Sequence, residues 1–174
     1  MSAQRAPDDL RRFASEVRSL AVALRAHGAW LATAESCTGG LIAAACTSVA
    51  GSSEWFDRGF VTYSNAAKIE TLGVDAALIE QHGAVSQPVA RAMAEGALAH
   101  SHSTIALAVT GVAGPGGATA GKPVGTVWLA WARRGDRGEQ RLQLTGGRAA
   151  VRAATVHAAL RRALELARHL ASTS

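Results

Sequence analysis

Short apolar runs of strand length alternate with segments of helical periodicity along almost the whole chain, and this alternation limits the possible folds more than any other feature. The run at 104–109 is continuously apolar, as expected for a strand in the middle of a sheet. We expect strands at 30–34, 55–63, 104–109, 124–132 and 140–144, and helices at 8–27, 41–49, 64–72, 75–81 and 149–170, with another helix beginning at 86. This alternation predicts an α/β layered domain with a partly parallel sheet.

The 174 residues are enough for one domain and few for two. A domain of this length buries roughly 70% of its unfolded surface, so it needs no disulfide bonds for stability. The two cysteines, Cys37 and Cys46, lack the spacing of a zinc site or a redox pair, which favours a reducing cytoplasm. No membrane span or signal peptide is visible. We expect residues 1–7 and 171–174 to be flexible ends.

The net charge of +5 favours an anionic partner, either a phosphate group or a nucleic acid. Most of the arginines, however, lie in the two terminal segments, where the helical period places them on outer faces. No nucleic-acid-binding motif accompanies them. A solvated outer face is therefore favoured over a surface that binds nucleic acid.

A small nucleophile lies between an expected strand and an expected helix, in the turn that contains Ser36. This position aims a side chain at the edge of the sheet where α/β domains bind ligands, and the amides of the following helix point to the same place. Gly39 and Gly40 would let a ligand approach the backbone closely. An ordinary Ser/Thr cap is the alternative. Cys37 is a second possible nucleophile, although an inert core position is favoured for it.

A serine nucleophile needs a base, and the sequence offers no Gly-x-Ser-x-Gly elbow and no histidine with an evident triad partner. The histidines also lack metal-ligand spacing. The chain has only two lysines, and one of them, Lys68, lies within six residues of its only tyrosine, Tyr63, and its only asparagine, Asn65. A buried lysine with a lowered pKa can act as the base. The alternative is a surface lysine beside a half-buried tyrosine.

The glycine-rich loop at 110–123 follows the clearest strand, where a loop can hold a substrate, although a plain connection is the alternative. Gly116 to Lys122 matches the spacing of a phosphate-binding P-loop. Pro123 occupies the position of the Ser or Thr that would hold magnesium, and no strand lies immediately before Gly116. ATP binding of that type is therefore excluded.

Taken together, these blocks resemble the CinA C-terminal domain family, the nicotinamide-nucleotide amidases of the PncC type. The resemblance is carried by AESCTGGLIAA (34–44), GSSEWFDRGFVTYSNAAKIETLGV (51–74), GAVS (83–86), AVTGVAGPGG (108–117) and KPVGTVWLA (122–130). The blocks occur in order over nearly the whole chain, which is more specific than any one of them.

The resemblance implies a single three-layer α/β/α domain over 1–174, with a mixed, partly parallel sheet, that usually forms a homodimer. It implies hydrolysis of nicotinamide mononucleotide to nicotinate mononucleotide and ammonia in the cytoplasm, for NAD synthesis, without metal or cofactor. The implied catalytic residues are Ser36, Tyr63 and Lys68. The expected substrate-binding residues are Thr38, Gly39, Gly40, Asn65, Thr110, Gly111, Gly114, Gly116, Lys122 and Arg148.

One departure from the family pattern concerns Arg148, which follows Gly147 where relatives often have an acidic residue. In the expected mechanism, Lys68 takes the Ser36 proton directly or through Tyr63, and amides around residues 38–40 stabilise the oxyanion. Two alternatives remain: a phosphate-sugar-binding module without catalysis, and a nucleic-acid-associated protein linked to competence or DNA damage.

Overall fold

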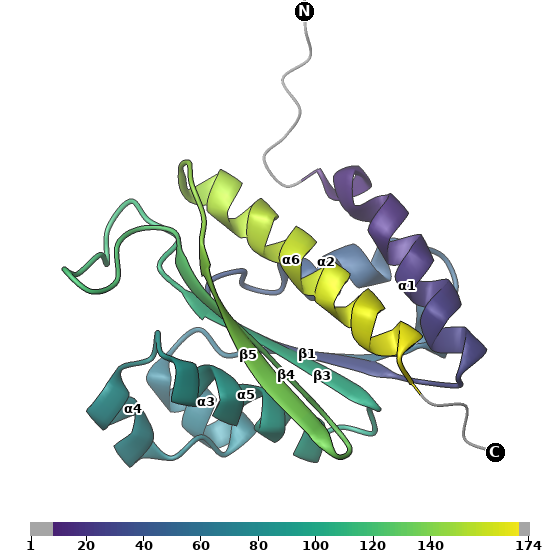
Figure 1. Cartoon of the computed structure of the whole chain (residues 1–174), viewed down its shortest axis with the longest axis horizontal. Coiled ribbons are helices and arrows are strands. Elements are labelled where there is room, and N and C mark those ends of the chain that lie inside the picture. The colour runs from purple at the N-terminus through teal and green to yellow at the C-terminus, as the bar shows by residue number, and fades with distance from the viewer. Residues whose placement is uncertain (1–8, 171–174) are drawn as a thin grey trace, which may run out of the picture.

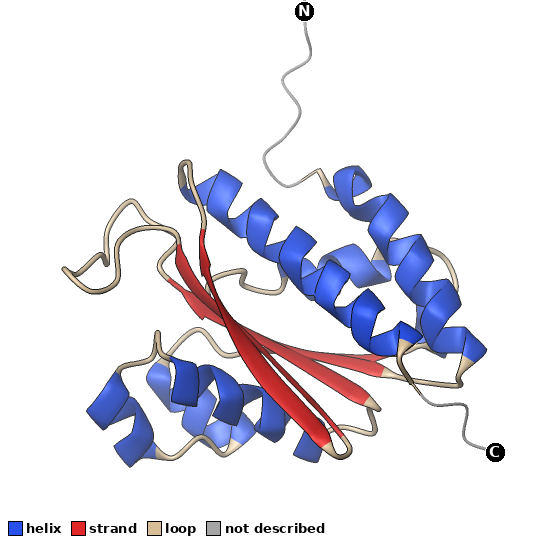
Figure 2. Ribbon diagram, viewed as in Figure 1, coloured by secondary structure: helices blue, strands red, loops and turns tan. Residues whose placement is uncertain are grey.

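The computed structural model describes residues 9–170 and contains one five-stranded sheet in the order β2-β1-β3-β4-β5. Its strands are β1 (Leu31–Glu35), β2 (Phe56–Val61), β3 (Ile105–Gly111), β4 (Thr126–Arg133) and β5 (Asp136–Gln143). β1 runs parallel to β2 and β3, whereas β4 is antiparallel to both of its neighbours. The expected mixed, partly parallel sheet is confirmed (Figure 2). The ends expected to be flexible, 1–7 and 171–174, lie outside the described residues.

Helices cover both faces of this sheet, which makes three layers (Figure 1). One face carries α1 (Ala14–Ala26, after a 3-10 turn at Leu10–Phe13), α2 (Leu41–Thr47) and α6 (Arg148–Arg168), and a short 3-10 turn (Ser52–Glu54) precedes β2. The other face carries α3 (Asn65–Leu72), α4 (Ala76–His82) and α5 (Gln87–Ala99). The three-layer α/β/α fold is thus confirmed. None of the described helices is long and apolar enough to cross a membrane.

Two apolar cores, one on each face of the sheet, hold these layers together. The first lies between α1, α6 and the sheet and includes Leu20, Leu107 and Leu160, and the second packs α5 against the other face through Val89 and Met93. Alanine lines the inner side of both helix layers. A side chain of this size adds helix propensity and lets helices approach the sheet closely.

The β4–β5 hairpin differs from the sequence expectation. The expected strands at 124–132 and 140–144 leave the charged residues between them as a turn, but the turn is only Arg134–Gly135 and β5 begins at Asp136. Polar residues can enter this strand because β5 is at the sheet edge and is half-exposed, which hides its strand character from a hydrophobic pattern. Gly138 is required within it, because a Cβ there would lie 2.4 Å from the Trp131 ring.

Candidate active site

The carboxyl ends of the three parallel strands meet at one edge of the sheet, and the site is built there. β1 ends at Glu35 and leads directly into Ser36, whose amide donates to the Val109 carbonyl oxygen of β3 at 3.0 Å. β2 ends at Val61, two residues before Tyr63. The parallel topology therefore brings together residues that are distant in sequence.

Ser36 and Lys68 are in direct contact at this edge. The Lys68 Nζ donates to Ser36 Oγ at 3.2 Å and to the Thr62 carbonyl oxygen at 2.8 Å. Only 1% of Lys68 is exposed, and within residues 9–170 it forms no ion pair with a carboxylate. Burial lowers the pKa of Lys68 below its ordinary value. A neutral amine can accept the proton of the serine that it contacts.

The local sequence explains why the lysine reaches the serine. Ser64 caps α3, because its Oγ accepts the amide N–H of Ala67 at 3.0 Å. This cap starts the helix immediately after β2, so Lys68 lies one turn in, on the buried side that faces the sheet. The surface-lysine alternative is therefore wrong.

Tyr63 is oriented differently from the lysine. It is 57% exposed, and its Oη accepts from Arg148 Nη2 at 2.6 Å. Arg148 Nη1 also donates to the Gly114 carbonyl oxygen at 3.0 Å. Arg148 thus joins the end of β2 to the glycine-rich loop. Among the described hydrogen bonds Tyr63 Oη has Arg148 as its partner and not Lys68, so the direct route from Ser36 to Lys68 is the one that the geometry favours.

The amides expected to stabilise an oxyanion are only partly available. The Gly39 amide donates to the Ser36 carbonyl oxygen at 3.0 Å, and the Gly40 amide donates to Glu35 Oε2 at 3.1 Å. Within residues 9–170, the Thr38 amide has no acceptor. Of the three amides expected to face an oxyanion, those of Gly39 and Gly40 therefore already have internal acceptors.

The other expected substrate-binding residues are spread around the same edge. Thr110 is buried and donates from Oγ1 to the Ala84 carbonyl oxygen at 2.9 Å, and Lys122 Nζ donates to the His82 carbonyl oxygen at 3.0 Å. Gly111 is needed for packing, because a Cβ there would lie 2.6 Å from the Val127 side chain. Asn65 is exposed at the first position of α3, and Gly116 is exposed with open space around it.

Cys37 is buried and packs with Ala113, Val127 and Val151. Burial raises the pKa of its thiol to about 11, so the reactive thiolate is scarce at neutral pH. This supports the inert alternative for Cys37. Groups of three or more His, Cys, Asp or Glu side chains that could hold a metal ion are not found in the described part of the chain.

Two residues that sequence reasoning missed also shape the site. Glu35 accepts hydrogen bonds from the amides that begin α2, and Arg152 Nη2 donates to the Thr38 carbonyl oxygen at 3.0 Å. A carboxylate between a buried strand and a helix capped by glycine was the available signal for Glu35. Arg152 is one turn after Arg148 in α6, a spacing that places both side chains on the same side of the helix.

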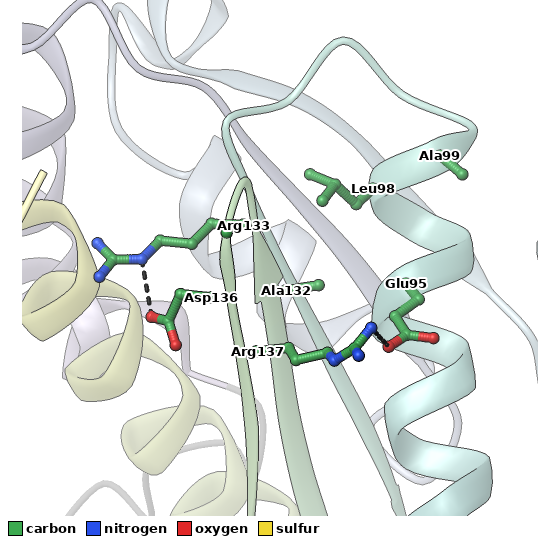
Figure 3. Close-up of a pocket in the computed structure, with 8 residues that line it drawn as sticks. Glu95, Leu98, Ala99, Ala132, Arg133, Asp136 and Arg137 are labelled. Atoms are coloured by element: carbon green, nitrogen blue, oxygen red, sulfur yellow. Dashed lines mark hydrogen bonds and ion pairs between the residues drawn. The ribbon is translucent and has the colours of Figure 1, made fainter. Parts of the chain in front are cut away.

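A separate cavity of about 500 Å³ lies at the opposite end of the sheet, between α5 and the β4–β5 hairpin (Figure 3). Arg133, at the end of β4, pairs with the first residue of β3, whereas Ser36 bonds to Val109 near the other end of β3. The cavity contains two ion pairs, Arg133–Asp136 and Arg137–Glu95, which neutralise its charges internally. It is therefore distinct from the Ser36 site.

Residues 14–167 match the family described as "CinA C-terminal domain". The chain belongs to the CinA C-terminal domain family. It is 54% identical over 134 residues (76% of this chain and 82% of the relative) to "Nicotinamide-nucleotide amidohydrolase PncC" of Enterobacter agglomerans. It is 55% identical over 143 residues (82% and 89%) to the protein of the same name from Pseudomonas putida.

The same fold is found in a solved structure that this chain resembles. The "competence/damage inducible protein CihA from Agrobacterium tumefaciens" superposes with a TM-score of 0.85 at 45% identity, covering 95% of this chain and 99% of that one. The fold inferred from the CinA resemblance is therefore shared with a solved relative over nearly its full length.

Proposed function

We propose that this protein hydrolyses the carboxamide of nicotinamide mononucleotide to nicotinate mononucleotide and ammonia, with Ser36 as nucleophile and Lys68 as base. The observation that carries the mechanism is the 3.2 Å contact between Lys68 Nζ and Ser36 Oγ inside a site where the pKa of the lysine is lowered. The names of relatives at more than 50% identity support this substrate.

In the first half-reaction, neutral Lys68 accepts the Ser36 hydroxyl proton as Oγ attacks the carboxamide carbon. The tetrahedral intermediate collapses, its C–N bond breaks, and the departing amine takes the proton from Lys68 and leaves as ammonia. In the second, Lys68 accepts a proton from water, which attacks the ester carbonyl carbon. The ester C–O bond then breaks, and Ser36 Oγ regains its proton from Lys68. The Thr38 amide is our candidate for stabilising the oxyanion in both halves.

The phosphate of the substrate needs a cationic site, and the start of α6 supplies one. Its cap residue, Gly147, has no side chain, its first turn has no acidic residue, and Arg148 is the first residue of the helix. The positive end of a 21-residue helix and a guanidinium together favour a dianion. We assign the phosphate to Arg148 and the ribose to the neighbouring loop at Gly114 and Gly116.

We also propose a homodimer, because large apolar side chains are exposed beside the site. Val61 and Tyr63 are 52% and 57% exposed, and Ile69 is 36% exposed. They lie at the end of the edge strand β2 and on α3. A second copy that covered this patch would remove apolar surface from water and would close the site on its open side. The two free cysteines, Cys37 and Cys46, are compatible with a cytoplasmic location.

An ammonia-release assay with nicotinamide, its riboside and its mononucleotide tests the proposal. We expect the mononucleotide to have the highest kcat/KM, and Ser36→Ala to release no ammonia while retaining the wild-type circular dichroism spectrum. Tight binding of the mononucleotide by wild-type protein without ammonia release would instead identify a binding module. Near wild-type deamidation by Ser36→Ala would exclude the covalent mechanism.

A further inference from the structure

Glu35, the residue that precedes the proposed nucleophile, is a completely buried carboxylate whose two oxygens accept five hydrogen bonds. Oε2 accepts from Thr38 Oγ1 (2.6 Å), the Ile42 amide (3.0 Å) and the Gly40 amide (3.1 Å), and Oε1 accepts from the Ala43 amide (2.8 Å) and Thr33 Oγ1 (3.2 Å). Three of the five donors are backbone amides that can only donate. The site therefore suits an ionised carboxylate, which is the form with two accepting oxygens.

These amides belong to the cap residue and the first turn of α2, a helix that lacks the usual side-chain cap. The cap residue is Gly40, with φ of +94°, so an acceptor for the free amides must come from elsewhere. Glu35 supplies it from the end of the preceding strand. The positive end of α2 is thereby neutralised by an anion of the protein itself, so this helix is not where the substrate phosphate binds.

The same contacts fix both ends of the turn that carries Ser36. At its start, the Ser36 amide is held by the Val109 carbonyl oxygen at 3.0 Å. At its end, Glu35 holds the Thr38 hydroxyl and the Gly40 amide. Between these two anchors the Ser36 hydroxyl lies 3.2 Å from Lys68 Nζ, a distance that a small movement of the turn would lengthen beyond hydrogen bonding.

We propose that Glu35 is a positioning residue for the reaction, which keeps the Ser36 hydroxyl within reach of Lys68 by clamping the start of α2 to the end of β1. The inference rests on the proposed function of Ser36 and Lys68. Glutamine has nearly the same shape but cannot replace glutamate. In either orientation its NH2 group would point at an amide that can only donate, either that of Ala43 or those of Gly40 and Ile42.

Steady-state kinetics of Glu35→Gln with nicotinamide mononucleotide test the role. We expect kcat to fall about 100-fold, since a displacement near 1 Å has an effect of that size, while KM changes by less than about threefold. The matched control is Glu139→Gln, the same chemical change at a carboxylate on β5 that accepts from Gln87 and Arg91, away from the turn. It should lower the melting temperature and leave kcat within about twofold of wild type.

A second readout is independent of the substrate: the rate at which phenylmethylsulfonyl fluoride modifies Ser36, followed by intact mass. Glu35→Gln should slow this modification at least about tenfold relative to Glu139→Gln. If wild type releases no ammonia but Glu35→Gln still slows modification, the proposed substrate is wrong and the positioning role stands.

Wild-type kcat or an unchanged modification rate in folded Glu35→Gln would overturn the proposal. Should Glu35→Gln fail to fold, Thr38→Val removes only the 2.6 Å hydroxyl contact with the carboxylate and leaves the backbone intact. We expect Thr38→Val to lower kcat about tenfold with little change in KM. Full activity in Thr38→Val would contradict the clamp.

Discussion

Replacing Lys68 by methionine separates the catalytic role of the amine from its effect on stability. The substitution keeps a long, flexible side chain in a position that is 1% exposed and removes the amine that contacts Ser36 Oγ. Loss of a general base lowers turnover by about 10²–10⁴-fold. We therefore expect ammonia release from nicotinamide mononucleotide to fall by at least about 100-fold at every pH.

The stability of Lys68→Met should depend on pH in a defined direction. Two hydrogen bonds are lost, to Thr62 at 2.8 Å and to Ser36 at 3.2 Å, at about 1 kcal/mol each. Well above pH 10.4, where the lysine is mostly neutral in both the folded and the unfolded state, the variant should be less stable by about 2 kcal/mol.

At lower pH the difference in stability between wild type and Lys68→Met should shrink. Because the folded pKa of Lys68 is lowered, the unfolded chain binds the proton first as the pH falls, and wild type loses stability between about pH 10.4 and the folded pKa. Lys68→Met lacks this loss, so the stability difference between wild type and the variant narrows by about 1.4 kcal/mol for each unit by which folding lowers the pKa of Lys68. Urea unfolding of both proteins at pH 7 and pH 10 measures it.

Lys68→Arg is the matched comparison, because a guanidinium stays charged at both pH values. It should be inactive like Lys68→Met, but destabilised at both pH values by an unpaired buried charge. A stability difference between wild type and Lys68→Met that does not vary with pH would refute a lowered pKa. Substantial turnover by Lys68→Arg would exclude the lysine as base.

Three further predictions follow from the same site. In wild type, kcat/KM should rise with pH through a value below the ordinary pKa of lysine, because protonated Lys68 is not a base; a profile flat from pH 6 to 10 would contradict this. Arg148→Ala should raise KM for the mononucleotide about tenfold more than for the riboside, because only the mononucleotide carries the phosphate. Equal changes in KM for the two compounds would show that Arg148 does not bind the phosphate. Cys37→Ala should keep most of the activity. Iodoacetamide should not inactivate native protein at pH 7, because burial raises the pKa of the Cys37 thiol to about 11. Rapid inactivation by modification of Cys37 would contradict its assignment as an inert core residue.

The sequence predicted the α/β layers because apolar periodicity reports burial. The pairing of Ser36 with Lys68 was implied by the family resemblance, and the structure explains it: β1 and β2 are parallel neighbours, so the residues that follow them lie at the same edge of the sheet. Whether Lys68 is a buried base or a surface lysine could be decided only from its position on α3. That position depends on the Ser64 cap, which lies at the start of the helix expected at 64–72.

The remaining site features depend on side-chain conformations that no periodicity encodes. Glu35 is polar in a strand that is otherwise apolar or threonine, and its five donors come from residues up to eight positions away. The Tyr63–Arg148 contact joins residues 85 positions apart through rotamers set by packing. The expected strand at 140–144 is shorter than β5, because an edge strand tolerates charged residues that a hydrophobic pattern assigns to a turn.

Interception of the acyl-enzyme by hydroxylamine tests the covalent mechanism most directly. If Ser36 forms an ester with the nicotinate group, hydroxylamine should compete with water for that ester. The hydroxamate should then replace nicotinate mononucleotide as product in proportion to the hydroxylamine concentration, and Ser36→Ala should form no hydroxamate. Continued release of ammonia with nicotinate mononucleotide as the sole product at high hydroxylamine would show that water attacks the amide directly, without an ester on this serine.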